Sequence, residues 1–159
     1  MRLVVVSVGR LKAGPERSLV ERYVERAAPL ARSLGLGALD LVEIPESRAR
    51  RDAERKAEEA AAILARLGAG PVVVFDERGA ALSSEAVAAR FGAWRDAGET
   101  ALHLVVGGPD GLDEAVRRRA TLVLSFGAMT LPHQLVRALV VEQLYRAMTI
   151  LAGHPYHRA

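Results

Sequence analysis

Five short apolar runs, each rich in Val and Leu, alternate along the chain with longer amphipathic segments. The runs end in Gly, Pro or polar residues, which is typical of strands buried on both faces of a sheet. We expect strands at residues 2–9, 39–44, 71–75, 101–106 and 120–125. Helical spacing occupies residues 15–33, 47–67, 83–96 and 112–119, and Pro132 begins a last helix that ends near residue 151. This strict alternation predicts an α/β fold, with a mostly parallel sheet and helices on both faces.

The length of the chain, 159 residues, suits one domain with one core, and no linker, repeat or low-complexity segment divides it. We therefore expect a single domain spanning residues 1–159. No stretch reaches the about 20 apolar residues of a membrane helix, because Arg137, Glu142 and Arg146 interrupt the longest candidate. With no cysteine and no recognisable signal peptide, the composition favours a soluble protein of the reducing cytoplasm.

Three loops follow successive expected strands and share one predicted edge of the sheet. They read "FDERG" after residue 74, "VVGGPDGL" around residue 108 and "SFGAMTLPH" after residue 124. Ligands of open α/β sheets bind beyond the carboxyl ends of the strands, so these loops are the first candidates for a binding site.

The glycine-rich loop fits neither of the common phosphate-binding motifs, since no Gly-Lys-Ser/Thr follows and the GxGxxG spacing is absent. Gly107 and Gly108 allow a ligand to approach the backbone, while Pro109 and Asp110 favour a turn. A ligand loop and an ordinary strand-to-helix turn remain equally compatible with these residues.

The loop after residue 124 carries apolar side chains that a polar connection would not need. Phe126, Met129 and Leu131 either pack inward or wall an apolar pocket, and Gly127 and Ala128 leave backbone groups exposed. Such a wall suits a flat heterocycle, although a loop merely docked on the sheet has the same composition.

The last expected helix carries two apolar stripes. One contains Val136, Val140, Leu144, Ala147 and Leu151, and the other Leu135, Leu139, Tyr145 and Met148. One stripe covers the protein's own sheet, and the second is most economically covered by a symmetric partner. The sequence therefore predicts a homodimer.

The helix at 47–67 shows a narrower apolar stripe and a solvated charged face. The stripe contains Ala53, Ala57, Ala60, Leu64 and Leu67.

Three of the four histidines lie in the last section of the chain, at His133, His154 and His157. No carboxylate or thiolate accompanies them at a ligating spacing, so we expect no metal site. They lie near further cationic and aromatic residues, namely Arg137, Tyr156 and Arg158. Such a set offers hydrogen-bond donors, positive charge and one stacking surface, which suits a single splayed nucleotide. The pI near 9.8 also suits a polyanionic partner, although an arginine-rich composition explains it equally well.

The segments "VVGGPDGL" and "AMTLPHQLVRALVVEQLYRAMTILAGHPYHR", together with their spacing, resemble the RlmH family of small SPOUT-class methyltransferases. The resemblance spans nearly the whole chain. It implies a deep trefoil knot near the C-terminus, S-adenosylmethionine as the cofactor bound in that knot, and an obligate homodimer. It also implies methylation of N3 of a pseudouridine in 23S rRNA on the assembled ribosome, without a metal.

Carried over by motif, the resemblance assigns roles to individual residues. The cofactor site would consist of Phe75, Gly107, Gly108, Phe126, Gly127, Ala128, Met129, Thr130 and Leu131. The substrate would contact His133 and Arg137. The catalytic set would be the tail residues His154, Tyr156, His157 and Arg158, folded over the cofactor of the neighbouring protomer. Three positions depart from the usual family residues: Phe75 replaces Leu, Asp110 replaces Glu, and Gly127 replaces a small polar residue.

Two alternatives stay open. The chain could be a non-catalytic ribosome- or RNA-binding module that retains the knotted fold, with arginines on phosphates and no cofactor. The tail could also serve only to staple the last helix to the sheet.

Overall fold

The computed structural model describes residues 1–158, in which five strands and five helices alternate along the chain. The strands are β1 (Arg2–Val8), β2 (Leu39–Ile44), β3 (Val72–Ala80), β4 (Ala101–Val106) and β5 (Leu122–Leu124). The helices are α1 (Pro15–Ser33), α2 (Asp52–Leu64), α3 (Ser84–Asp96), α4 (Glu114–Arg119) and α5 (His133–Leu151). The predicted order of strands and helices is confirmed.

All five strands belong to one sheet, in the order β2-β1-β4-β3-β5, and every neighbouring pair is parallel. The predicted α/β class is therefore confirmed. Because β4, β3 and β5 are neighbours, their carboxyl ends lie side by side at one edge of the sheet.

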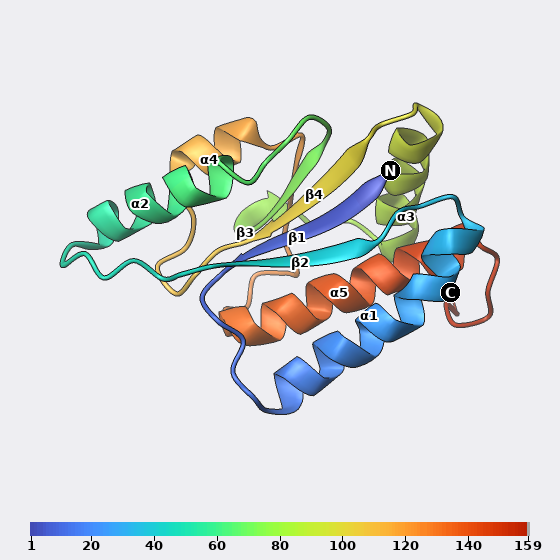
Figure 1. Ribbon diagram of the computed structural model, residues 1–159, viewed down its shortest axis with the longest axis horizontal. Helices are drawn as coiled ribbons and strands as arrows, with labels where there is room; N and C mark the ends of the chain where they lie inside the picture. The colour runs from blue at the N-terminus through green and yellow to red at the C-terminus, as the bar shows by residue number, and fades with distance from the viewer. Residues whose placement is uncertain (159) are drawn as a thin grey trace.

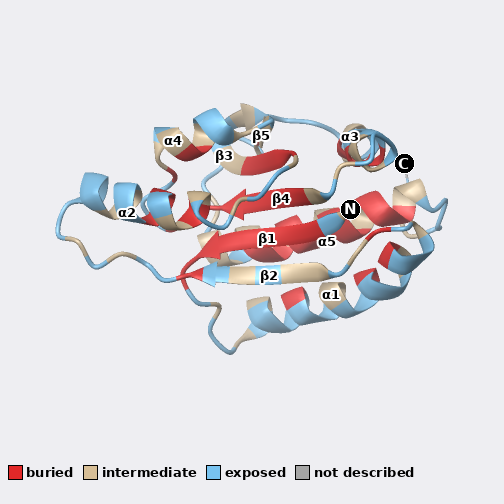
Figure 2. Cartoon of the chain, turned by 45° about the horizontal axis from the view of Figure 1, so that its top comes forward, coloured by how far each residue is buried: buried red, intermediate tan, exposed pale blue. Residues whose placement is uncertain are grey.

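Helices cover both faces of the sheet, as Figure 1 shows: α1, α3 and α5 lie on one face, and α2 and α4 on the other. Alternation along β1 explains this arrangement, because successive side chains of a strand point to opposite faces. Leu3 and Val5 join the core under α5, whereas Val4 and Val6 join the core under α2. The central strands β1 and β4 are buried along nearly their whole length (Figure 2).

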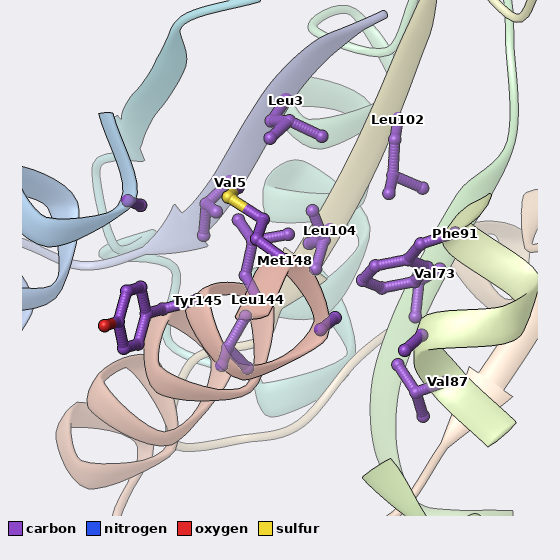
Figure 3. Packing of buried hydrophobic residues seen from close by; sticks show 14 of the residues in the cluster. Leu3, Val5, Val73, Val87, Phe91, Leu102, Leu104, Leu144, Tyr145 and Met148 are labelled. Atoms are coloured by element: carbon purple, nitrogen blue, oxygen red, sulfur yellow. The ribbon is translucent and has the colours of Figure 1, made fainter. Parts of the chain in front are cut away.

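The larger core lies between the sheet and α5. Figure 3 shows Leu144 and Met148 of α5 facing Val5 and Leu104 of the central strands, with Phe91 of α3 closing one side. This packing fixes the direction of α5, which begins at the edge of the sheet where the strands end.

Helix α2 is shorter than expected, because it begins at Asp52 and residues 47–51 form an irregular segment. The predicted apolar stripe is also partly wrong: Ala53 and Ala57 are exposed, while Ile63 and Ala60 are buried. Alanine carries little apolar area, so the burial of Ile63, more than that of the alanines, determines which side of this helix faces the sheet.

Strand β3 is longer than the sequence indicated, and its last residues meet β5 twice. Leu124 pairs with Phe75 and again with Ala80, and the Ser125 amide donates to the Ala80 carbonyl at 3.0 Å. A Cβ on Gly79 would lie 2.4 Å from the carbonyl carbon of Leu124, so only glycine allows this approach. The segment 75–80 therefore curls closely around the end of β5.

The second apolar stripe of α5 is covered largely by the chain itself. Tyr145 and Met148 are 3% and 1% exposed, and α1 packs along the same helix. Only the first turns of this stripe remain open, with Leu135 36% exposed and Leu139 half-buried. The apolar surface left for a partner is therefore smaller than the sequence indicated, and it lies at the N-terminal end of α5.

Candidate functional site

A cleft of about 360 Å³ opens at the carboxyl ends of β3, β4 and β5. All three loops identified from the sequence line it, together with the first turn of α5. Its volume falls in the range of about 300–1,000 Å³ that is usual for small-molecule and cofactor sites. The expectation that these loops share one edge is confirmed.

The glycine turn after β4 is compact because its neighbours leave no room for side chains. A Cβ on Gly108 would lie 2.9 Å from Cγ1 of Val8, and one on Gly107 would lie 2.8 Å from Cγ of Leu112. Gly111 has a φ of 80° and donates its amide to the Gly108 carbonyl at 3.0 Å. The absence of side chains at these glycines is therefore needed for the turn to pack against β1, and it also leaves space for a ligand.

Asp110 is held in this turn by a two-point contact with Arg55 of α2. The Arg55 Nε donates to Oδ2 at 2.6 Å and Nη2 donates to Oδ1 at 3.0 Å. The same guanidinium lowers the pKa of the Asp110 carboxyl, so the pair stays charged at neutral pH. The sequence indicated Asp110 as a turn residue and as a departure from the usual family glutamate, but it gave no sign of Arg55, because the two lie 55 positions apart.

A buried carboxyl lies behind the turn. Glu59 is 5% exposed, and its Oε2 is 3.5 Å from the position of a Cβ on Gly108. Burial raises the pKa of Glu59, while the Ser47 amide, which donates to Oε1 at 2.9 Å, opposes that effect. Nothing in the apolar periodicity of α2 indicated a buried glutamate.

One wall of the cleft is aromatic. The rings of Phe75 and Phe126 stack with centroids 5.2 Å apart and an angle of 10° between their planes. The same pair borders a second, mainly apolar cavity of about 260 Å³, which reaches Phe91 and Leu144 in the core. The aromatic pair therefore separates a charged cleft from an apolar one.

The loop after β5 is exposed at residues 126–130. Ser125 Oγ donates to the Gly127 carbonyl at 3.0 Å and accepts the Gly127 amide at 3.1 Å, which fixes the start of the loop. Phe126 is 38% exposed and Met129 is 81% exposed. Of the two alternatives for this loop, the structure therefore favours walling a pocket over packing inward. The predicted residues Ala128, Thr130 and Leu131 lie in the same loop, and Thr130 and Leu131 line the cleft.

A second ion pair joins two of the segments that line the cleft. Arg117 Nη1 donates to Oδ2 of Asp76 at 2.9 Å and to the Leu112 carbonyl at 2.8 Å. Asp76 follows Phe75 directly, so this pair connects the loop after β3 with the end of the glycine turn. Sequence analysis missed both residues.

The two predicted substrate residues occupy different environments. His133 lines the cleft at the start of α5, and burial, followed by the charge of Arg137, lowers its pKa. Arg137 is only 4% exposed, and its guanidinium donates to the carbonyls of Val8 and Gly9 and pairs with Glu43 at 3.2 Å. Its guanidinium is committed to the protein interior, so the structure gives Arg137 a scaffolding position in place of the predicted substrate contact.

The predicted catalytic tail lies at the other end of α5. That helix has 19 residues, which places its ends about 28 Å apart. Tyr156 donates its hydroxyl to Oε1 of Glu142 at 3.0 Å, and its ring packs edge-on against Tyr145 at 4.8 Å. His157 Nε2 lies 2.7 Å from Oε1 of Glu85. His154 and Arg158 are exposed. The structure therefore does not bring the tail to the cleft of the same chain.

The part of the chain that the structure describes contains neither a candidate metal-binding group nor a candidate membrane-spanning helix. Residues 1–158 contain no group of three or more His, Cys, Asp or Glu side chains placed to hold a metal ion. None of the helices within these residues combines the length and apolar character needed to cross a bilayer.

Residues 1–157 match the family described as predicted SPOUT methyltransferases. A protein named ribosomal RNA large subunit methyltransferase H from Methylobacterium radiotolerans is 63% identical, over 99% of this chain and 98% of the relative. Its namesake from Xanthobacter autotrophicus is 59% identical, over the full length of both chains. A solved structure of a probable methylase family protein from Haemophilus influenzae aligns at 15% identity, with a TM-score of 0.49, over 99% of this chain and 70% of that chain.

Proposed function

Because the chain belongs to the SPOUT methyltransferase family, we propose that it transfers a methyl group from S-adenosylmethionine to N3 of a pseudouridine in 23S rRNA. The acceptor would be the assembled ribosome in the cytoplasm. The rRNA methyltransferase names of relatives about 60% identical support rRNA as the substrate. The observation that carries the proposal is the cleft, where the three loops implied by the RlmH resemblance converge.

The cleft fits S-adenosylmethionine on three counts. Phe75 and Phe126 offer a flat ring face for adenine. The Gly107 and Gly108 backbone lines the cleft without side chains. Its rim carries both Glu77 and Arg78, which match the ammonium and carboxylate of the methionine moiety.

When bound, S-adenosylmethionine supplies an electrophilic methyl group, so the protein needs to align the acceptor nitrogen and remove its proton. The apolar loop residues Met129 and Leu131 line one side of the cleft. His133 lies at the same opening, and its lowered pKa leaves it neutral at pH 7, able to accept a hydrogen bond from the base.

We assign the tail residues His154, Tyr156, His157 and Arg158 to the pseudouridine, acting on the cleft of a second copy of the chain. The separation of about one full helix between tail and cleft supports this assignment, since the tail cannot complete its own site. The exposed Leu135 and Met129 beside the cleft supply apolar surface for such a homodimer.

We further assign residues 1–159 to one domain with a deep trefoil knot. The contacts of Leu124 with both ends of the segment 75–80 support a threaded chain at this point, because they enclose the end of β5 within a loop of β3. The membership of all five described strands in one sheet supports the single domain.

Methyl transfer to ribosomes tests the proposed function. Purified protein, labelled S-adenosylmethionine and ribosomes that lack this methyl group should yield N3-methylpseudouridine in digested 23S rRNA, detected by mass spectrometry. The competing function is a ribosome-binding module without catalysis. Protein that binds ribosomes but shows no affinity for S-adenosylmethionine in calorimetry would establish that competitor.

A further inference from the structure

The connection between β2 and α2 is irregular but closely held. The Ser47 amide donates to Glu59, and Arg55 Nη1 donates to the carbonyls of Ala49 and Arg50, each at 3.1 Å. Figure 1 shows this connection reaching out to the far end of α2, beyond the sheet. A segment without its own secondary structure is thus fixed by side chains of the helix that follows it.

The fixed segment carries three exposed arginines, Arg48, Arg50 and Arg51. The Arg51 side chain is 81% exposed, and its nearest carboxylate oxygen, on Glu54, is 3.7 Å away. Within residues 1–158, no carboxylate pairs with the guanidinium of Arg48 or Arg50. Three positive charges against the single Glu46 of residues 45–51 give the segment a basic surface.

Arg55 connects this basic surface to the cleft. Its Nη1 holds the carbonyls of the segment, while Nε and Nη2 hold both carboxylate oxygens of Asp110 in the glycine turn. One planar guanidinium therefore sets the position of the three arginines relative to Gly107 and Gly108. Arginine is suited to such a junction because its donors diverge in a rigid plane.

Other basic residues border the same edge of the sheet. Arg10 and Lys12 follow β1, and Lys56 and Arg78 line the cleft. The loops after β1, β2 and β3 therefore bring positive charge to this edge of the sheet, where a backbone of phosphates would approach, although the cleft itself is also lined by Asp76, Glu77 and Asp110.

We propose that Arg48, Arg50 and Arg51 form a binding surface for rRNA backbone phosphates, and that Arg55 is the positioning residue that aligns this surface with the cofactor cleft. The identity of the polyanion as rRNA rests on the proposed function. Phosphate contacts fix the register of a nucleic acid on a protein, so this surface sets which nucleotide reaches the cleft.

The test is ribosome binding as a function of salt, measured without S-adenosylmethionine. The variant carries Arg48→Gln, Arg50→Gln and Arg51→Gln together. Each lost phosphate contact reduces the slope of log K against log salt by about 0.7–0.9, so the triple variant should lose about 2 units of slope and about tenfold or more in affinity. Its calorimetric affinity for S-adenosylmethionine should equal that of the parent.

A matched control removes the same charge elsewhere. Arg22, Arg32 and Arg90 are exposed on α1 and α3, and the triple change to Gln should leave the salt slope at the parent value. An unchanged slope in the Arg48/Arg50/Arg51 variant, or an equal loss in the control, would overturn the proposed surface.

Arg55→Lys tests separately whether Arg55 connects the basic surface with the cleft. The change keeps the positive charge and removes the planar guanidinium that contacts both the 47–51 segment and Asp110. We expect weaker binding of both ribosomes and S-adenosylmethionine, whereas Asp110→Asn should weaken S-adenosylmethionine binding alone. Parent affinities for both ligands in Arg55→Lys would overturn the positioning role. Ribosome binding is measured without methyl transfer, so the two proposals are tested separately. An inactive parent would refute the proposed function, whereas the phosphate-binding surface would still be decided by the salt slope of ribosome binding.

Discussion

The ring of Phe126, at the end of β5, lies parallel to the ring of Phe75, at the end of β3, with 5.2 Å between their centroids. The two residues are about fifty positions apart in the sequence, and the curled segment 75–80 brings them together. The pair gives the cleft one flat apolar wall, a surface suited to stacking with a planar group.

Replacing Phe126 tests this wall. Because Phe126 is 38% exposed, Phe126→Ala should reduce the free energy of unfolding only slightly. Loss of a stacking partner is worth about 1–3 kcal/mol for a base, so the dissociation constant for S-adenosylmethionine should rise by roughly 5- to 150-fold. Calorimetric titration measures it, with Leu82→Ala, on the second cavity only, as the control. Equal affinities of Phe126→Ala and the parent would mean that adenine binds elsewhere.

The glycine turn gives a second prediction, in which stability and binding change together. A valine at position 108 removes space at the cleft, and its Cβ would also lie 2.9 Å from the Val8 side chain. Overpacking of this kind costs about 1–3 kcal/mol, so Gly108→Val should unfold at lower urea as well as lose S-adenosylmethionine binding. Adding Val8→Ala should restore part of the stability and none of the binding. Full stability in Gly108→Val alone would show that the turn moves freely away from β1.

Arg137 gives a third prediction, which distinguishes a scaffold from an RNA contact. Arg137→Met leaves the Val8 and Gly9 carbonyls without their buried donor, and each buried acceptor left unsatisfied costs about 1–3 kcal/mol. Urea unfolding should show this loss, and Arg137→Lys should recover only part of it. A stable Arg137→Met protein with weakened ribosome binding would instead support the substrate role that the sequence indicated.

Much of the fold follows from local sequence, because strand burial and helix periodicity depend on neighbouring residues. The boundaries of α1, β2 and β4 match the expected ones to within a residue. The errors have tertiary causes. Helix α2 starts late because Arg55 and Glu59 bind the backbone before it, and those contacts have no signature in helix periodicity.

The candidate site was predictable as a set of loops but not as a set of contacts. The edge shared by three strands follows from parallel pairing, so the loops containing Gly107 and Phe126 could be identified from order alone. The ion pairs Arg55–Asp110 and Arg117–Asp76 join positions 55 and 41 residues apart, and one sequence contains no signal for them. The burial of Arg137 could not be predicted either, because nothing in the sequence distinguishes a buried arginine on an apolar helix from an exposed one.

The tail gives a fourth prediction, through complementation between two inactive variants. Deletion of residues 153–159 should abolish methyl transfer, preserve S-adenosylmethionine binding, and lower stability because the Tyr156 contacts are lost. A cleft variant such as Phe126→Asp should keep its tail and lose the cofactor. If the tail acts on a second copy, mixing the two proteins restores activity, since one mixed site has both parts intact. Mixed samples that stay inactive, while sedimentation shows mixed dimers, would refute a shared site.

Tyr156 gives a fifth prediction, for alkaline pH. Burial, followed by its hydrogen bonds with Tyr23 and Glu142, raises the pKa of the Tyr156 hydroxyl above its usual value near 10. In the unfolded chain this tyrosine loses its proton first, so its contribution to stability is complete below about pH 10 and declines as pH rises further. Thermal melting between pH 8 and pH 11 should show this decline, and Tyr156→Phe should reduce it. A variant with the parent's pH dependence would assign the decline to other groups.

The pairing of Leu124 with both Phe75 and Ala80 also bears on the order of assembly. Residues after 124 supply Phe126 and the first turn of α5, whereas β3 and β4, much earlier in the chain, lead into the other loops that line the cleft. Contacts between such distant parts of a chain form slowly. We therefore expect the binding cleft to mature last during biosynthesis, so that a newly released polypeptide passes through a folded but inactive stage before it can bind its cofactor.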